Sequence, residues 1–190
     1  MQKIIVSLVG HPGSGKTSVA RYLQEKHDFM PFSFGTVIRE YAAKEGIRLE
    51  KRADYANTHA RILKEHGWDY TLQLALGLDT ERLCVDDMRV VRYAELLRQA
   101  GGIEIAFDCP PETRFAHTQN HVDTAKYPTD FASFIQNERD DDAVEIAPGL
   151  KFETDKVMRT ADYHLDAAGT LERTFEQTDT IIAQVMHAKG

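Results

Sequence analysis

The chain has 190 residues and a formal net charge of −7, with 42% hydrophobic and 28% charged residues. This length and composition predict one globular domain with a substantial core, which excludes a disordered chain, a collagen and a coiled coil. The acidic balance argues against a general nucleic-acid-binding protein, because such proteins need a basic face. Cys84 and Cys109 form no disulfide framework, and no apolar run approaches the roughly 20 residues that span a bilayer, so we expect a cytoplasmic protein.

Strands and helices are predicted to alternate along most of the chain. Short runs rich in β-branched residues predict strands, and apolar residues at helical spacing predict helices. In chain order the expected elements are strand 3–9, helix 16–26, strand 29–34, a helix capped by Thr36, helices 54–66 and 68–76, strand 82–85, helix 90–99, strand 103–107, a helix that starts at Pro111, strand 163–165 and a helix capped by Thr170. This order predicts an α/β fold with a parallel sheet, which binds ligands at the carboxyl ends of its strands.

The first predicted strand ends in a glycine-rich loop of the form G-x-x-x-x-G-K-[ST], the phosphate-binding P-loop. The residues expected to bind the nucleotide are Gly10, His11, Pro12, Gly13, Ser14, Gly15, Lys16, Thr17 and Ser18. Glycines let backbone N–H groups approach phosphate oxygens, and the following helix directs its positive end at them. Lys16 is expected to reach the β- and γ-phosphates of ATP, and Thr17 to offer its hydroxyl to Mg²⁺.

Magnesium bound beside a P-loop needs a second protein anchor, usually an acid at the end of another buried strand. The apolar run that ends at Val85 is followed directly by Asp86 and Asp87. We predict that Asp86 binds Mg²⁺ or its water ligands, and Asp87 is the weaker candidate. The alternative is a solvent-exposed Asp-Asp turn.

Further motifs follow the P-loop in a recognisable order. They are Phe34-Gly35-Thr36-Val37-Ile38-Arg39-Glu40, Asp86-Asp87-Met88-Arg89, Arg139-Asp140-Asp141, Ala161-Asp162-Tyr163 and Gly169-Thr170-Leu171-Glu172. Together they resemble the nucleoside monophosphate kinase group of P-loop proteins, and best a small adenylate-kinase-like branch that includes dephospho-CoA-kinase-like proteins. The resemblance implies a three-layer α/β/α P-loop NTPase fold in a single domain over 1–190. It also implies a small helical acceptor-binding insertion over 36–78 and a short lid over 114–139.

The resemblance also assigns roles to several arginines. Arg39 and Arg89, with Gly35, would bind the acceptor phosphate, and Arg114 and Arg139 would stabilise the transferred phosphoryl group. The physical reason is that a kinase holds two anionic substrates, so it needs planar positive donors besides the P-loop lysine. For each arginine the alternative is a surface salt bridge.

Three positions depart from the pattern of these relatives. Thr36 replaces a common Asp, Asp87 replaces a Gly, and His117 stands where a first lid arginine is expected. Asp87 would place a negative charge beside the acceptor phosphate unless it turns away. A zinc site at His117 and His121 lacks a further ligand, so a solvent-exposed lid surface is favoured. The basic residues left to cover the transferred group are Arg114, Lys126 and Arg139.

These observations predict an enzyme that moves the γ-phosphoryl group of ATP to a nucleoside monophosphate or a similar small phosphorylated acceptor, with Mg²⁺. One alternative is a dephospho-CoA-kinase-like enzyme, which would need a general base near the P-loop. Another is a P-loop regulatory NTPase without a phosphoryl acceptor. Small-molecule nucleotides are the expected partners, with no nucleic acid and no membrane, and the chain is expected to be a monomer or a homodimer.

Overall fold

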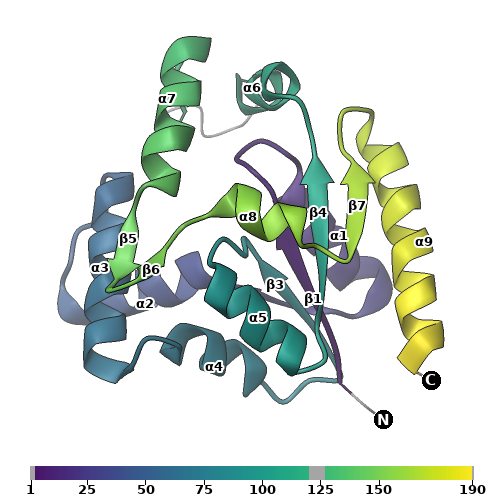
Figure 1. The fold of residues 1–190 in the computed structure, drawn as a ribbon, viewed down its shortest axis with the longest axis horizontal. Coiled ribbons are helices and arrows are strands. Elements are labelled where there is room, and N and C mark those ends of the chain that lie inside the picture. The colour runs from purple at the N-terminus through teal and green to yellow at the C-terminus, as the bar shows by residue number, and fades with distance from the viewer. Residues whose placement is uncertain (1–2, 120–126, 190) are drawn as a thin grey trace.

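The computed structural model describes residues 3–119 and 127–189. Its centre is a five-stranded sheet in the order β2-β3-β1-β4-β7, in which each neighbouring pair is parallel. The strands are β1 (Ile4–Val9), β2 (Met30–Ser33), β3 (Arg82–Asp86), β4 (Ile103–Asp108) and β7 (Tyr163–Asp166). The predicted parallel α/β sheet is therefore confirmed. Since β1 lies between β3 and β4, the loops after these three strands meet at one edge of the sheet (Figure 1).

Helices cover both faces of this sheet (Figure 1). They are α1 (Lys16–His27), α2 (Phe34–Glu45), α3 (Arg52–His66), α4 (Tyr70–Leu76), α5 (Val91–Gln99), α6 (Pro111–Gln119), α7 (Phe131–Asp142), α8 (Thr154–Arg159) and α9 (Leu171–Lys189). A small antiparallel hairpin, β5 (Glu145–Ala147) and β6 (Leu150–Lys151), joins α7 to α8. None of the described helices is long and apolar enough to cross a bilayer.

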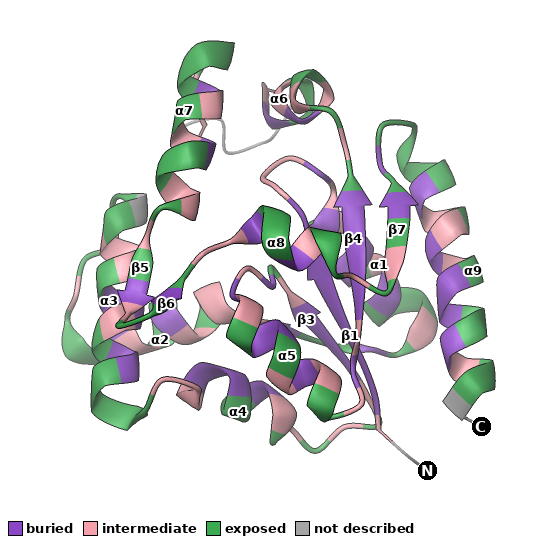
Figure 2. Ribbon diagram, in the orientation of Figure 1, coloured by how far each residue is buried: buried purple, intermediate pink, exposed green. Residues whose placement is uncertain are grey.

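Two apolar clusters hold the layers together. On one face, Val6 of β1 belongs to a buried cluster with Leu23 of α1 and Ile182 of α9. On the other face, Val85 of β3 belongs to a cluster with Leu97 of α5, and α8 and the hairpin contribute to the same cluster. Figure 2 shows the central strands as the most continuously buried part of the fold. Burial on both faces explains why the central strands β3, β1 and β4 have largely apolar sequences.

The structure corrects one predicted boundary near the site. Thr36 does not cap the second helix, because α2 begins at Phe34 and the extended residue before it is Ser33. The Phe34 ring packs against Phe32 and Tyr93, with ring centroids 5.5 and 5.7 Å apart. This tertiary packing favours a helical conformation three residues earlier than the local capping pattern predicts.

Helices α2, α3 and α4 come between β2 and β3 in the sequence, and they fill most of the range 36–78 that is predicted as an acceptor-binding insertion. The elements between α6 and β7 were not predicted from the sequence. Helix α7, the hairpin and α8 occupy this range, and the acidic run 138–142 falls within it. The acidic run lies at the end of α7, and Glu138 within it is buried.

Candidate functional site

The loop between β1 and α1 takes the conformation that its glycines allow. Gly13 and Gly15 have φ values of 80° and 90°, in the left-handed region that side chains disfavour. A Cβ atom on Gly13 would also lie 2.4 Å from the backbone oxygen of Arg114 in α6. The loop is therefore packed directly beneath α6 and leaves no room there for a side chain.

Lys16 is the first residue of α1, and its ammonium group turns back over the loop. Its Nζ donates hydrogen bonds to the carbonyl oxygens of Gly10, at 2.6 Å, and His11, at 3.1 Å. The same Nζ lies 3.7 Å from a carboxylate oxygen of Asp87. The lysine side chain is only 9% exposed, so the positive charge is concentrated inside the loop that would hold phosphates.

Asp86 lies at the end of β3, directly beside the P-loop. The pairing of Ser7 with Val85 in neighbouring parallel strands places it there. The Thr17 hydroxyl donates to Asp86 Oδ2 at 3.3 Å, and Asp86 Oδ1 is buried with no hydrogen-bond partner among the described residues. A hydroxyl and a buried, unpaired carboxylate oxygen are ligands that suit Mg²⁺. The two residues predicted to hold Mg²⁺ are thus adjacent, and their chemistry fits the ion.

The backbone at position 87 suits the glycine of the kinase pattern that the sequence resembles. Asp87 has a φ of 64°, in the left-handed region that glycine adopts without a steric penalty. Its half-exposed carboxylate faces Lys16 rather than turning away from the site. Burial, and then the charge of Asp87, raise the pKa of Asp86 to about 6. Asp87 therefore lies close to the P-loop residue Lys16 and also raises the pKa of the predicted magnesium ligand Asp86.

Replacing Asp87 by asparagine is expected to lower the pKa of Asp86, because one neighbouring negative charge is removed. A carboxylate whose pKa is raised to about 6 makes the free energy of unfolding fall as the pH rises from about 4 to about 6. The variant should show a weaker fall over that window. Carboxyl ¹³C NMR titration of the ligand-free protein measures the pKa directly.

The matched control for this prediction is Asp28→Asn. Asp28 is also an exposed aspartate with a positive φ, 55°, and lies at the opposite end of α1. The control should leave the Asp86 titration unchanged. A titration that is the same in Asp87→Asn and wild type would contradict the prediction.

The predicted acceptor residues Gly35 and Arg39 lie together at the start of α2. Arg39 is exposed, and its Nη2 donates to the Thr36 hydroxyl at 2.9 Å. A Cβ atom on Gly35 would lie 3.3 Å from Arg39 Nη1, so the glycine leaves room for the guanidinium group. Arg139 is exposed on α7. No contact joins either of these arginines to the P-loop among the described residues.

Arg114 lies on α6 and is buried in an ion pair. Its guanidinium group binds both carboxylate oxygens of Glu138 in α7 and also donates to the backbone oxygens of Cys109, at 3.1 Å, and Pro12, at 3.3 Å. The structure thus places Arg114 against the P-loop, through its hydrogen bond to Pro12. In this conformation four of its five N–H donors bind protein groups, and the second N–H of Nη2 has no hydrogen-bond partner among the described residues.

His117, at the predicted position of a lid arginine, also contacts the loop. Its Nδ1 lies 2.9 Å from the carbonyl oxygen of Gly13 and acts as the donor to it. The side chain therefore supports the P-loop backbone in addition to lying on an exposed surface. His121 and Lys126, the other lid residues considered above, lie outside the described residues.

One polar cluster beside the loop was not predicted. His11 Nε2 lies 2.8 Å from a carboxylate oxygen of Asp155, and these two residues and Asp142 place three possible metal ligands within 4.8 Å of one another. The Arg89 guanidinium group already donates to Asp142 at 3.2 Å. That neighbouring positive charge opposes a second cation, so we interpret the cluster as a polar link between the P-loop and α8. No sequence motif marks Asp142 or Asp155.

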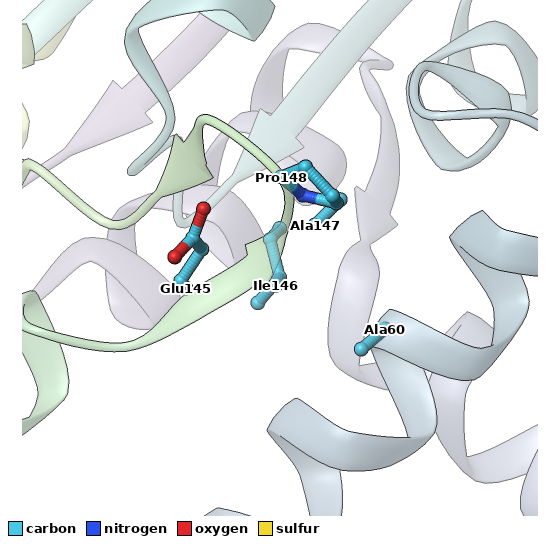
Figure 3. Close-up of a pocket in the computed structure, with 5 residues that line it drawn as sticks. All are labelled: Ala60, Glu145, Ile146, Ala147 and Pro148. Carbon is cyan, nitrogen blue, oxygen red and sulfur yellow. The ribbon is translucent and has the colours of Figure 1, made fainter.

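Two features of the helical range over 34–76 do not join this site. His59 is buried, lies 3.1 Å from the Thr71 hydroxyl, and has its pKa lowered by burial to about 4, so it is a neutral core residue. A hollow of about 490 Å³ lies between Ala60 of α3 and the turn of the β5–β6 hairpin (Figure 3). Its lining contains none of the predicted site residues.

Comparison with known proteins supports the P-loop kinase fold. The chain is 26% identical over 194 residues to a UPF0200 protein of Methanococcus maripaludis, covering 94% of this chain and 99% of that protein. It is 50% identical over 48 residues to a cytidylate kinase of Methanocella arvoryzae, covering 25% of this chain and 27% of the kinase. The solved structure of shikimate kinase from Acinetobacter baumannii in complex with shikimate superposes with a TM-score of 0.58 at 18% identity, covering 97% of this chain and 93% of that chain.

These likenesses confirm the resemblance to P-loop kinases that the motifs indicate. The structural neighbour establishes the fold alone, because its identity to this chain is low. A protein-family model described as an AAA domain matches residues 6–143, which include the P-loop, Asp86, Arg89 and α6. Since that match covers most of the chain, the protein belongs to this AAA-domain family of P-loop proteins.

Proposed function

We propose that the protein is an ATP-dependent phosphotransferase that transfers the γ-phosphoryl group of ATP to a nucleoside monophosphate or a similar small phosphorylated acceptor. The observation that carries the proposal is the arrangement at the carboxyl edge of the sheet. Lys16 lies inside the phosphate-binding loop, and Thr17 meets the unpaired carboxylate of Asp86. Arg89 follows three residues after Asp86, and the cytidylate kinase relative supports an acceptor of the monophosphate class.

The residues divide into a donor group and an acceptor group. Lys16 and the loop N–H groups bind the β- and γ-phosphates, while Thr17 and Asp86 hold Mg²⁺. When bound, Mg²⁺ neutralises charge on the phosphates and so favours attack at the γ-phosphorus. Arg39 and Arg89 bind and orient the acceptor phosphate. Positioning and charge neutralisation supply most of the catalysis in phosphoryl transfer, so no protein nucleophile is needed.

A second candidate is transfer to a sugar hydroxyl, as in dephospho-CoA kinases. Such a reaction needs a general base beside the γ-phosphate. Asp86 is the candidate, because its pKa is raised to about 6 and one of its oxygens has no partner among the described residues. The phosphate acceptor is preferred because an arginine follows so closely after the strand end.

The test is a phosphotransfer screen with ATP and Mg²⁺ against ribonucleoside and deoxyribonucleoside monophosphates and dephospho-CoA. ADP and the phosphorylated product are followed together. Product formation with a monophosphate supports the proposal, and product formation with dephospho-CoA alone supports the second candidate. ADP formation at the same rate with and without every acceptor contradicts both and favours a regulatory NTPase.

Replacing Arg89 by alanine is expected to raise the acceptor KM and lower kcat, with a fall in kcat/KM of roughly 10²-fold, because a charged donor to the acceptor phosphate is lost. ATP affinity, measured by calorimetry, should be retained. Arg48→Ala is the control, since Arg48 is an exposed arginine paired with Glu50. If ATP binding falls as much as acceptor binding, the division of the site into donor and acceptor groups is wrong.

A further inference from the structure

Arg89 is held by groups that come from a distant part of the chain. Its Nη2 donates to Asp142 Oδ1 at 3.2 Å, and its Nε donates to the Thr154 hydroxyl oxygen at 3.2 Å. The guanidinium carbon lies 4.5 Å from the centroid of the Phe152 ring. The side chain is 13% exposed, so Arg89 is well enclosed before any substrate arrives.

The groups that hold Arg89 also hold one another. The Thr154 hydroxyl donates to Asp142 Oδ1 at 2.7 Å, so this oxygen receives hydrogen bonds from both Thr154 and Arg89. The backbone N–H of Glu153 donates to the carbonyl oxygen of Arg89 at 2.8 Å. The Nε and Nη2 edge of the guanidinium group is therefore fixed. In the part of the chain that the structure describes, Nη1 has no hydrogen-bond partner.

Asp142 also connects the acceptor side of the site to the P-loop. It is the last residue of α7, one turn after Glu138, which pairs with Arg114 at the P-loop. On α8, Asp155 follows Thr154 and contacts His11 of the P-loop at 2.8 Å. The segment from α7 to α8 thus contacts the donor loop and the predicted acceptor arginine at the same time.

We propose that Asp142 is a positioning residue for the acceptor phosphate, acting through Arg89. The inference rests on the proposed phosphotransferase function. A free arginine side chain loses rotamer entropy when it is immobilised, and prior fixation by Asp142 and Thr154 removes much of that cost from substrate binding. The open Nη1 then meets the acceptor phosphate in a fixed orientation. The orientation of the guanidinium group is set by Asp142 Oδ1, which accepts hydrogen bonds from both Arg89 and Thr154.

Asp142→Asn is expected to raise the acceptor KM by about tenfold or more, as for loss of a charged hydrogen bond, and to lower kcat less. The ATP dissociation constant should not change. Asp142→Glu should restore part of the acceptor affinity, which a purely structural role does not predict. Asp140→Asn is the matched control, because Asp140 lies on the same helix, is exposed, and bonds Gln136.

Thermal melting of each variant shows whether it is folded. If Asp142→Asn does not fold, Thr154→Val tests the same link, since it removes the hydroxyl group that joins Asp142 to Arg89; it should also raise the acceptor KM. An active wild type with an unchanged acceptor KM in the folded variant overturns the inference. A wild type without acceptor-dependent turnover instead overturns the proposed function, so the two failures are distinguishable.

Discussion

Replacing Lys16 by alanine is expected to lower turnover by roughly 10³-fold or more and to remove measurable ATP binding. A single preorganised donor to a reacting anion contributes about 10²–10³-fold to kcat, and Lys16 also supplies the charge inside the loop. Its ammonium group is buried against the carbonyl oxygens of Gly10 and His11, so alanine also removes two hydrogen bonds that shape the loop. Steady-state kinetics and calorimetry with ATP measure the two losses.

Lys26→Ala is the matched control for this substitution. Lys26 lies on α1 like Lys16, but near the end of the helix that is far from the P-loop. Its side chain is half-exposed and pairs with Asp179 of α9. The control removes the same atoms from the same residue type. It should leave turnover and ATP affinity within about twofold of wild type, because exposed ion pairs contribute little. Retention of turnover in Lys16→Ala would refute the assignment of the loop as the phosphate site.

Replacing Glu138 by alanine is expected to destabilise the protein by about 3–5 kcal/mol, because it leaves the buried Arg114 charge without its partner. For a chain of this size such a loss corresponds to a fall in Tm of the order of 10 °C. Differential scanning calorimetry measures the change. The loss should be larger than that for Glu65→Ala, which breaks an exposed ion pair with Arg61 on α3.

A double-mutant cycle separates the ion pair from its surroundings. Arg114→Met combined with Glu138→Ala should be less destabilised than the sum of the single variants, because neither charge is then left buried and alone. If the destabilisation of the double variant equals the sum of the two single variants, Arg114 and Glu138 do not interact as a buried ion pair. The cycle also reports on the P-loop, since Arg114 donates to the backbone oxygen of Pro12.

The donor half of the site could be predicted from the sequence because its signals are local. The P-loop motif specifies its own backbone, and the apolar run that ends at Asp86 specifies a buried strand. Two parallel neighbours then bring Thr17 and Asp86 together, as the strand order shows. The three central strands β3, β1 and β4 could be predicted because they are mostly buried and therefore have apolar sequences. The edge strands β2 and β7 are largely exposed and show a weaker pattern.

The acceptor half depended on contacts that no local pattern encodes. The hairpin strands are too short to show a pattern, and α7 ends in a run of charged residues. The contact of α7 with α6 depends on the pair of Arg114 with Glu138, whose charges look solvent-exposed in the sequence. The partners of Arg89 lie more than fifty residues away along the chain, and an acidic run gives no indication of which carboxylate turns inward. The left-handed backbone at Asp87 was likewise hidden, although a glycine in relatives is a sign of such a position.

The contact between Gly13 and α6 also limits how the site can open. The space for a Cβ atom at Gly13 is filled by the backbone of Arg114, and His117 from the same helix binds the Gly13 carbonyl oxygen. The loop and α6 are therefore joined at Gly13 by two contacts, and α6 falls largely within the range predicted as a lid. Any movement of α6 away from the loop would therefore break the hydrogen bond from His117 to the Gly13 carbonyl oxygen, so opening this end of the predicted lid would also alter the shape of the loop itself.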